Sequence, residues 1–184
     1  MTATPSATPR ATPGQTVGPF FGYALPYDGG PDLVPPTHPA AVQLTGRVLD
    51  GAGDGVPDAL LEIWQPDADG RIVREPGSWH RDGFTFTGWG RAATDSTGRY
   101  RFTTVRPGGT VPFIAMTVFA RGLLHRLFTR VYLPGTAVDT LLAGLPEQRR
   151  STLVAREDGR RLVFDVRLQG PDETVFLRYP GIDE

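Results

Sequence analysis

The sequence predicts a mainly β protein: a β-sandwich of about seven or more strands with one short helix and long N-terminal and connecting loops. Glycine (23) and proline (18) are abundant among the 184 residues, which favours short strands and tight turns over long helices. Several segments alternate apolar and polar residues with the period of a half-buried strand. Residues 1–15 predict a flexible N-terminal arm, and 16–184 a single β-sandwich domain, because no internal repeat or boundary is evident.

The strand predictions follow the chain in order. Alternation or continuous apolar character marks the segments 42–48, 59–64, 100–105, 113–120, 127–133, 161–168 and 174–178. A proline-rich connection occupies 28–40. The helix is predicted between Thr136 and about Arg150, with Thr136 as its N-cap and Val138, Leu141, Leu142 and Leu145 on one face.

Composition excludes several classes of function. The formal net charge is −1, so no global field attracts nucleic acid or an anionic membrane. The absence of cysteine excludes disulfides, thiolate metal sites and cysteine nucleophiles. The N-terminus is not a signal peptide and no apolar run is long enough to cross a bilayer, so we expect a cytoplasmic protein without membrane or nucleic-acid partners.

Few residues offer catalytic chemistry by spacing alone. His38, His80 and His125 do not pair at the intervals that place two imidazoles on one face of a strand or helix. Ser78 is near His80, but no glycine-flanked nucleophile turn surrounds the serine. Most aspartates lie in turns, where they have a structural use. Trp64, Phe84, Phe86 and Trp89 are interpreted as core or interface aromatics.

Arg121 is the charged residue with the clearest alternative to a surface role. It follows an apolar strand and precedes Gly122, so a rigid element would hold its guanidinium in place. An arginine in such a position can bind a carboxylate through two parallel hydrogen bonds. By pattern alone, a surface arginine remains the simpler interpretation.

Several segments resemble subunits of intradiol ring-cleavage dioxygenases of the protocatechuate 3,4-dioxygenase type. They are TPGQTVGPF (12–20), GRVLDG (46–51), VPDALLEIWQPDADG (56–70), GWGR (88–91), GRYRF (98–102), RPG (106–108) and FDVRLQG (164–170). The match is colinear from about residue 12 to residue 177. It implies a β-sandwich and an assembly that cleaves 3,4-dihydroxybenzoate (protocatechuate) with O₂.

The same resemblance implies that this chain holds no metal. The iron-binding subunits of the family hold Fe(III) with two tyrosines and two histidines, and the corresponding positions here are Phe113, Ala115, the neighbourhood of Trp79 and the tyrosine-free loop 108–112. Phenylalanine and alanine offer no lone pair to a metal. The chain therefore resembles the iron-free alpha subunit, and the resemblance implies a homologous iron-binding beta subunit as its partner, with Fe(III) in that partner and no catalytic residue here.

The resemblance also indicates which residues reach the partner's pocket. The family's alpha subunit contributes its N-terminal segment and one arginine, which correspond to Thr16, Gly18, Pro19 and Arg121 in substrate binding. Phe20 stands where a family tyrosine can follow the Gly-Pro pair. Two other classes stay open: a stand-alone small-molecule or protein binding module on the same sandwich, and an enzyme that uses His80 or His125.

Overall fold

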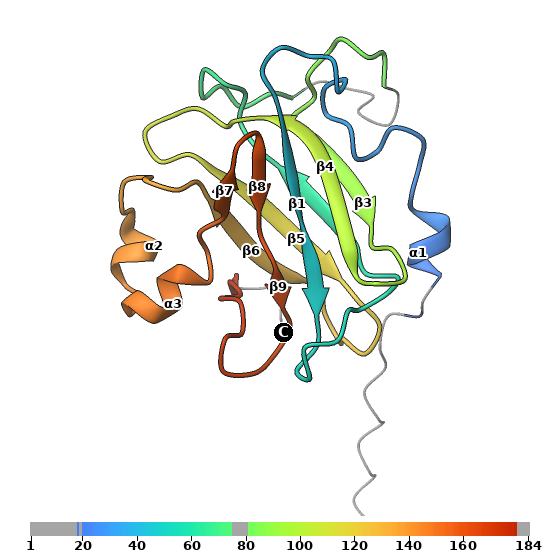
Figure 1. Cartoon of the computed structure of the whole chain (residues 1–184), viewed down its shortest axis with the longest axis vertical. Helices are drawn as coiled ribbons and strands as arrows, with labels where there is room; N and C mark the ends of the chain where they lie inside the picture. The colour runs from blue at the N-terminus through green and yellow to red at the C-terminus, as the bar shows by residue number, and fades with distance from the viewer. Residues whose placement is uncertain (1–17, 19, 75–80, 180–184) are drawn as a thin grey trace, which may run out of the picture.

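The fold consists of two β-sheets packed face to face (Figure 1). The computed structural model describes residue 18 and residues 20–74 and 81–179. These residues contain nine strands, in a five-stranded and a four-stranded sheet, so the predicted β-sandwich is confirmed. The assignment of residues 1–15 to an arm lies outside the described residues, and the single domain over 16–184 stays a prediction.

The five-stranded sheet is built around β1. Its strands are β1 (Ala41–Leu49), β4 (Arg99–Val105), β7 (Arg156–Asp158), β8 (Arg161–Val163) and β9 (Val166–Arg167). β1 pairs antiparallel with β4 on one side and parallel with β8 and β9 on the other, and β7 closes the edge beyond β8. The central position of β1 connects the first part of the domain to the last.

A break at Phe164 and Asp165 divides the predicted strand 161–168 into β8 and β9. The Asp165 carboxylate accepts a hydrogen bond from the Arg47 backbone N–H at 2.9 Å, and the buried Tyr100 hydroxyl donates to the Phe164 carbonyl at 2.6 Å. The backbone of Phe164 comes so close to Gly46 that a side chain there would collide with its carbonyl group. Glycine is therefore required at position 46 for steric reasons.

The four-stranded sheet is antiparallel throughout. It contains β2 (Leu60–Trp64), β3 (Trp89–Ala93), β5 (Phe113–Phe119) and β6 (Leu127–Tyr132), in the order β3-β2-β5-β6. Along β5, Ile114, Met116 and Val118 are buried against the other sheet, and the residues between them are less buried. This alternation leaves the second side of β5 directed away from the core.

The core lies between the two sheets and is almost wholly apolar. Large buried side chains from five of the strands fill it: Leu44, Leu61, Ile63, Phe102, Ile114 and Leu162. Each of these side chains is at most 1% exposed. A smaller cluster around Tyr132, Leu142 and Leu153 attaches the helical segment to the edge of the sandwich.

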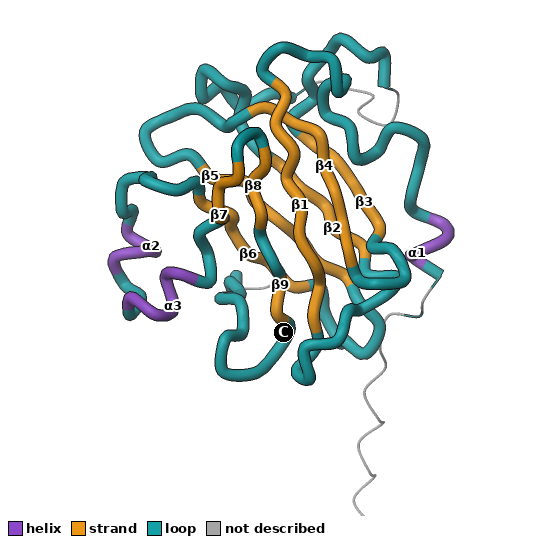
Figure 2. Tube along the Cα trace, viewed as in Figure 1, coloured by secondary structure: helices purple, strands orange, loops and turns teal. Residues whose placement is uncertain are grey.

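The single predicted helix is wrong in its extent. Within the described residues the structure has three short helices, α1 (Phe21–Ala24), α2 (Thr140–Ala143) and α3 (Glu147–Ser151), with α1 on the side opposite α2 and α3 (Figure 2). Pro146, the N-cap of α3, prevents one continuous helix over this segment because proline lacks the N–H that a continuing helix needs. The N-cap of α2 is Asp139, whose carboxylate accepts from the Leu142 N–H at 2.9 Å, and not Thr136.

Other expectations differ in detail. The segment 174–178 forms only an isolated bridge, between Leu177 and Phe128, instead of a strand. Trp64 is 47% exposed and Phe84 is 91% exposed, so neither is a core aromatic. No helix in the described part of the chain is long and apolar enough to cross a membrane.

Candidate functional site

The positions where the resemblance places iron-binding histidines lie on the outer face of the four-stranded sheet. Phe113 and Ala115 alternate with buried residues of β5 and point away from the core. The Phe113 ring packs against Tyr132, with ring centroids 5.7 Å apart, and the Arg130 guanidinium lies 4.2 Å above it. Both positions thus carry hydrocarbon side chains, which have no atom that can bind a metal.

A hollow of about 370 Å³ lies beside Ala115. It is lined mainly by aromatic and small side chains: Glu62, Ile63, Trp64, Trp89, Ala115, Thr117, Phe128 and Tyr179. The ring of Trp89 is covered by the Arg91 guanidinium at 5.0 Å, and Arg91 Nε donates to the Glu62 carboxylate at 2.9 Å. Because this ion pair neutralises Glu62, the hollow offers aromatic surface and no uncompensated base.

These residues do not fit a ferric ion. Fe(III) prefers hard anionic oxygen ligands together with imidazole nitrogen, and neither Phe113 nor Ala115 can supply a donor. The loop 108–112 has no tyrosine, while Trp79 and its neighbours lie outside the described residues. Among residues 18, 20–74 and 81–179, no group of three or more histidine and acidic side chains is placed to hold a metal ion.

Arg121 is held by a carboxylate that the sequence analysis did not connect with it. Its Nε donates to Asp58 at 3.0 Å and 3.3 Å, to the two carboxylate oxygens, and its Nη2 also binds the same group. The hydrogen bonds and charge of Asp58 raise the pKa of Arg121, so the guanidinium stays charged. The Arg121 side chain is 61% exposed and that of Asp58 is 18% exposed. Asp58 therefore orients an arginine that still faces outward.

Local backbone geometry explains why the two residues meet. Asp58 has a φ of +59°, in the left-handed region that aspartate tolerates better than most residues, and it lies two residues before the start of β2. Gly122 has a φ of +86°, which turns the chain immediately after Arg121. Both residues lie at the end of the sheet where β2 begins and β5 ends, because Leu60 pairs with Phe119.

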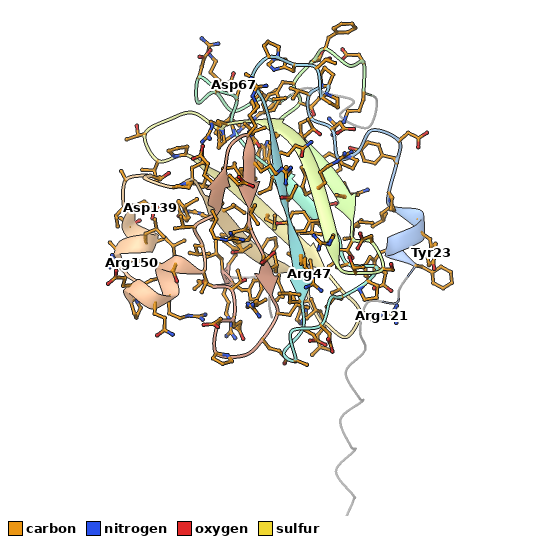
Figure 3. All side chains as sticks on the ribbon, viewed as in Figure 1. Tyr23, Arg47, Asp67, Arg121, Asp139 and Arg150 are labelled. Carbon is orange, nitrogen blue, oxygen red and sulfur yellow. The ribbon has the colours of Figure 1, made fainter. Side chains whose placement is uncertain are left out.

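The N-terminal site residues are only partly described. Gly18 is exposed, and a side chain added there would meet no atom within 4 Å; Thr16 and Pro19 lie outside the described residues. The next segment, α1, is anchored by buried Phe21, whose ring centroid lies 6.5 Å from that of Phe119 at the end of β5. Figure 3 accordingly shows Tyr23 of α1 and Arg121 on the same side of the molecule.

The surface around α1 is unusually apolar for an exposed segment. Phe20 is 79% exposed, Tyr23 is 84% exposed and Leu25 is 37% exposed. Aromatic residues that project from a short, weakly buried segment are typical of protein interfaces. Arg121 thus lies beside a surface with the composition of a subunit contact.

The histidines form no site in the described part of the chain. His38 accepts a hydrogen bond from the Ala40 N–H at 3.2 Å within its proline-rich loop, and His125 is exposed. Ser78 and His80 lie outside the described residues. His125 borders a hollow of about 690 Å³, but its imidazole forms no hydrogen bond or ion pair with another described residue that would orient it as a catalytic base.

Comparison with known proteins identifies the family. A family model described as a dioxygenase (Dioxygenase_C) matches residues 18–114, more than half of the chain. The chain belongs to the intradiol dioxygenase family. The resemblance predicted from the sequence is therefore confirmed. Intradiol dioxygenases depend on iron, whereas Phe113 and Ala115 of this chain offer no donor atom for it.

Relatives include both kinds of chain from one enzyme. The protocatechuate 3,4-dioxygenase alpha chain of Burkholderia cepacia is 42% identical, over 86% of this chain and 92% of the relative. The beta chain from the same organism is 37% identical, over 74% of this chain and 68% of the relative. The alpha chain of Pseudomonas putida is 35% identical, over 75% and 76% of the two chains. This chain is thus homologous to chains of both types.

Solved structures support the fold. The dioxygenase domain of a carbohydrate-binding fusion protein from Streptomyces sp. SirexAA-E aligns with a TM-score of 0.58 at 24% identity, covering 90% of this chain and 99% of that chain. Catechol 1,2-dioxygenase from Pseudomonas arvilla C-1 aligns with a TM-score of 0.57 at 19% identity, covering 86% and 62%. At these identities the likeness shows the shared sandwich alone.

Proposed function

We propose that this chain is the iron-free alpha subunit of a mixed protocatechuate 3,4-dioxygenase. A homologous beta subunit would hold the Fe(III), and the assembly would cleave 3,4-dihydroxybenzoate between its hydroxyl-bearing carbons to give 3-carboxy-cis,cis-muconate. Both atoms of O₂ would enter the product. The similarity to an alpha chain and to a beta chain of one enzyme supports a pair of related subunits.

The observation that carries the proposal is the chemistry of β5. Phe113 and Ala115 project from the sheet where the family's metal ligands are expected, and they provide no donor atom. A chain of this family that lacks ligands at its own site can still contribute to catalysis through the pocket of a partner. The alternative of a stand-alone binding module is not favoured, because the relatives that match most of the chain are dioxygenase chains.

This chain's own contribution would be binding and the exclusion of water. We assign Thr16, Gly18 and Pro19 to the wall of the partner's pocket, and Arg121 to recognition of the substrate carboxylate. The side of the molecule that carries α1 and Arg121 supports this assignment, because it combines exposed aromatic residues with an oriented positive charge. A desolvated pocket strengthens the attraction between a guanidinium and a carboxylate. We place the assembly in the cytoplasm.

Co-expression with a candidate iron-binding subunit tests the function. We expect the isolated chain to contain no stoichiometric iron and to lack the visible charge-transfer band of tyrosinate bound to iron. The co-purified pair should contain iron and consume O₂ with protocatechuate. Stoichiometric iron in the isolated chain would refute the assignment as an alpha subunit.

A further inference from the structure

The outer face of the five-stranded sheet carries a concentration of arginines. Arg99 and Arg101 of β4 alternate with buried Tyr100 and Phe102, so their side chains point away from the core. The other strands of the sheet add Arg47, Arg156 and Arg161 to the same hollow. Figure 3 shows Arg47 in the middle of this sheet face, in front of β1.

Strand register arranges three of these arginines around a trough. Arg101 pairs with Thr45 on β1, Thr45 with Val163 on β8, and Val163 with Arg156 on β7. Arg101 and Arg156 therefore face each other across three strand spacings, about 14 Å between backbones, with Thr45 and Val163 as the floor. We call this feature the arginine trough, defined by Arg101, Arg156 and Arg161 around Thr45 and Val163. The hollow it belongs to has a volume of about 660 Å³.

No ion pair within the described residues neutralises Arg101, Arg156 or Arg161, although Asp158 on β7 lies opposite Arg161. No hydrogen bond joins these three guanidinium groups to a described residue either. The nearby carboxylates of Asp95 and Asp165 accept hydrogen bonds from backbone N–H groups. Arg47 and Arg99, which line the same hollow, lie directly opposite each other on β1 and β4. Like charges in such a pair repel, so an anionic ligand in the hollow would relieve a repulsion built into the sheet.

We propose that the arginine trough binds a small multivalent oxyanion, a polycarboxylate or a polyphosphate. The planar guanidinium binds both groups through paired hydrogen bonds, and the volume lies within the range of small-molecule sites. Several negative charges are required because the guanidiniums approach from opposite sides. A compact ligand fits better than a long chain, since Pro31 borders the hollow and Asp95 and Asp165 would repel a longer polyanion.

Titration calorimetry on the full chain, in whatever assembly it purifies, tests this site directly. Citrate is the tricarboxylate probe, pyrophosphate the polyphosphate probe and benzoate the monovalent control. We expect citrate, pyrophosphate or both to bind once per chain, and benzoate to bind at least about tenfold more weakly, since it can pair with only one side of the trough. Binding is measured without reference to ring cleavage, so its outcome is independent of the proposed function.

Matched variants locate the binding. The double variant Arg101→Gln with Arg156→Gln should weaken the binding of the multivalent probe at least about tenfold. Arg71→Gln, an exposed arginine in a distant turn that contacts Asp69, should leave it unchanged. Lysine at positions 101 and 156 keeps the charge but loses the paired hydrogen bonds, so its affinity should lie between those of wild type and the glutamine variant. Binding by the lysine variant would also show that substitution at positions 101 and 156 does not by itself unfold the sheet.

The outcomes separate the ligand classes. Binding of citrate alone identifies carboxylate as the ligand, and binding of pyrophosphate alone identifies phosphate. The proposal is overturned if neither binds below about 10 mM, or if the glutamine variant binds as wild type does. A ten-residue polyglutamate peptide that binds about a hundredfold more tightly than citrate would also overturn it, by showing a protein-docking face.

Discussion

Replacing Arg121 by alanine is the sharpest test of the pocket role. Asp58 occupies Nε and Nη2 of this side chain, and Nη1 has no hydrogen bond to any described residue. One charge-assisted hydrogen bond in a pocket partly shielded from water corresponds to roughly a tenfold change in affinity. We therefore expect Arg121→Ala to raise the KM of the assembled enzyme for protocatechuate about tenfold, with little change in kcat, because the substrate carboxylate does not react.

Steady-state oxygen consumption with two substrates measures this effect. Catechol has no carboxylate, so its KM should change less than about twofold. Asp58→Asn is the companion variant, because asparagine also tolerates the φ of +59° and Arg121 keeps its charge while it loses part of its orientation; protocatechuate KM should rise less than in Arg121→Ala. An equal KM shift for both substrates, in an assembly of unchanged mass, would contradict the reasoning and reduce Arg121 to an interface residue.

Three further changes test the fold that supports the site. Tyr100→Phe leaves the Phe164 carbonyl without its buried donor and should lower the free energy of unfolding by about 1–3 kcal/mol in urea melts, whereas a change within error would show that another group replaces it. Gly46→Ala collides with the same carbonyl group and should destabilise by at least about 1–3 kcal/mol; an unchanged midpoint would mean that β1 and the Phe164 backbone can separate freely. Asp139→Ala removes the N-cap of α2 and should lower the free energy of unfolding by about 1 kcal/mol at neutral pH. Burial opposes the charge of Asp139, but hydrogen bonds from Leu142 and Tyr132 and the Arg130 charge outweigh it and lower its pKa. The charged carboxylate thus stabilises the fold above the ordinary aspartate pKa, and this stabilisation is lost as pH falls through the lowered pKa. The difference in unfolding free energy between Asp139→Ala and wild type should therefore shrink in acid. A difference that stays constant with pH would exclude the carboxylate as its source.

Most strands were predictable because they leave a local trace in the sequence, but β3 and β7 lie outside every predicted segment. The alternation in 42–48 and the apolar run at 113–120 correspond to β1 and β5. The extent of the helix was not predictable in the same way. The apolar stripe between 136 and 150 satisfies helical spacing even though Pro146 interrupts the hydrogen bonds of a continuous helix. The choice between core and interface for Trp64 could not be made from the sequence, because apolar residues on both sides of a strand do not reveal which side the second sheet covers.

Single residues of the candidate site could be proposed from the sequence, but their contacts could not. Arg121 was selected as a candidate from its place between an apolar strand and a glycine. Its partner Asp58 is 63 positions away, and the Arg91–Glu62 pair spans 29 positions, so neither contact has a spacing that periodicity can detect. The facing of Arg101 and Arg156 likewise depends on the register of four strands. Contacts of this kind follow from topology and not from local pattern.

The central place of β1 in the larger sheet has a consequence for how the protein is made. One edge of β1 pairs with β4, but the other edge needs β8 and β9, which lie near the end of the chain. A ribosome therefore makes β1 more than 110 residues before its second set of neighbours, so an unpaired strand edge exists until residues 161–167 emerge. The finished sheet, and with it the arginine trough, can form only after these residues have been made. Truncation before β8 should accordingly yield insoluble protein instead of a smaller sandwich.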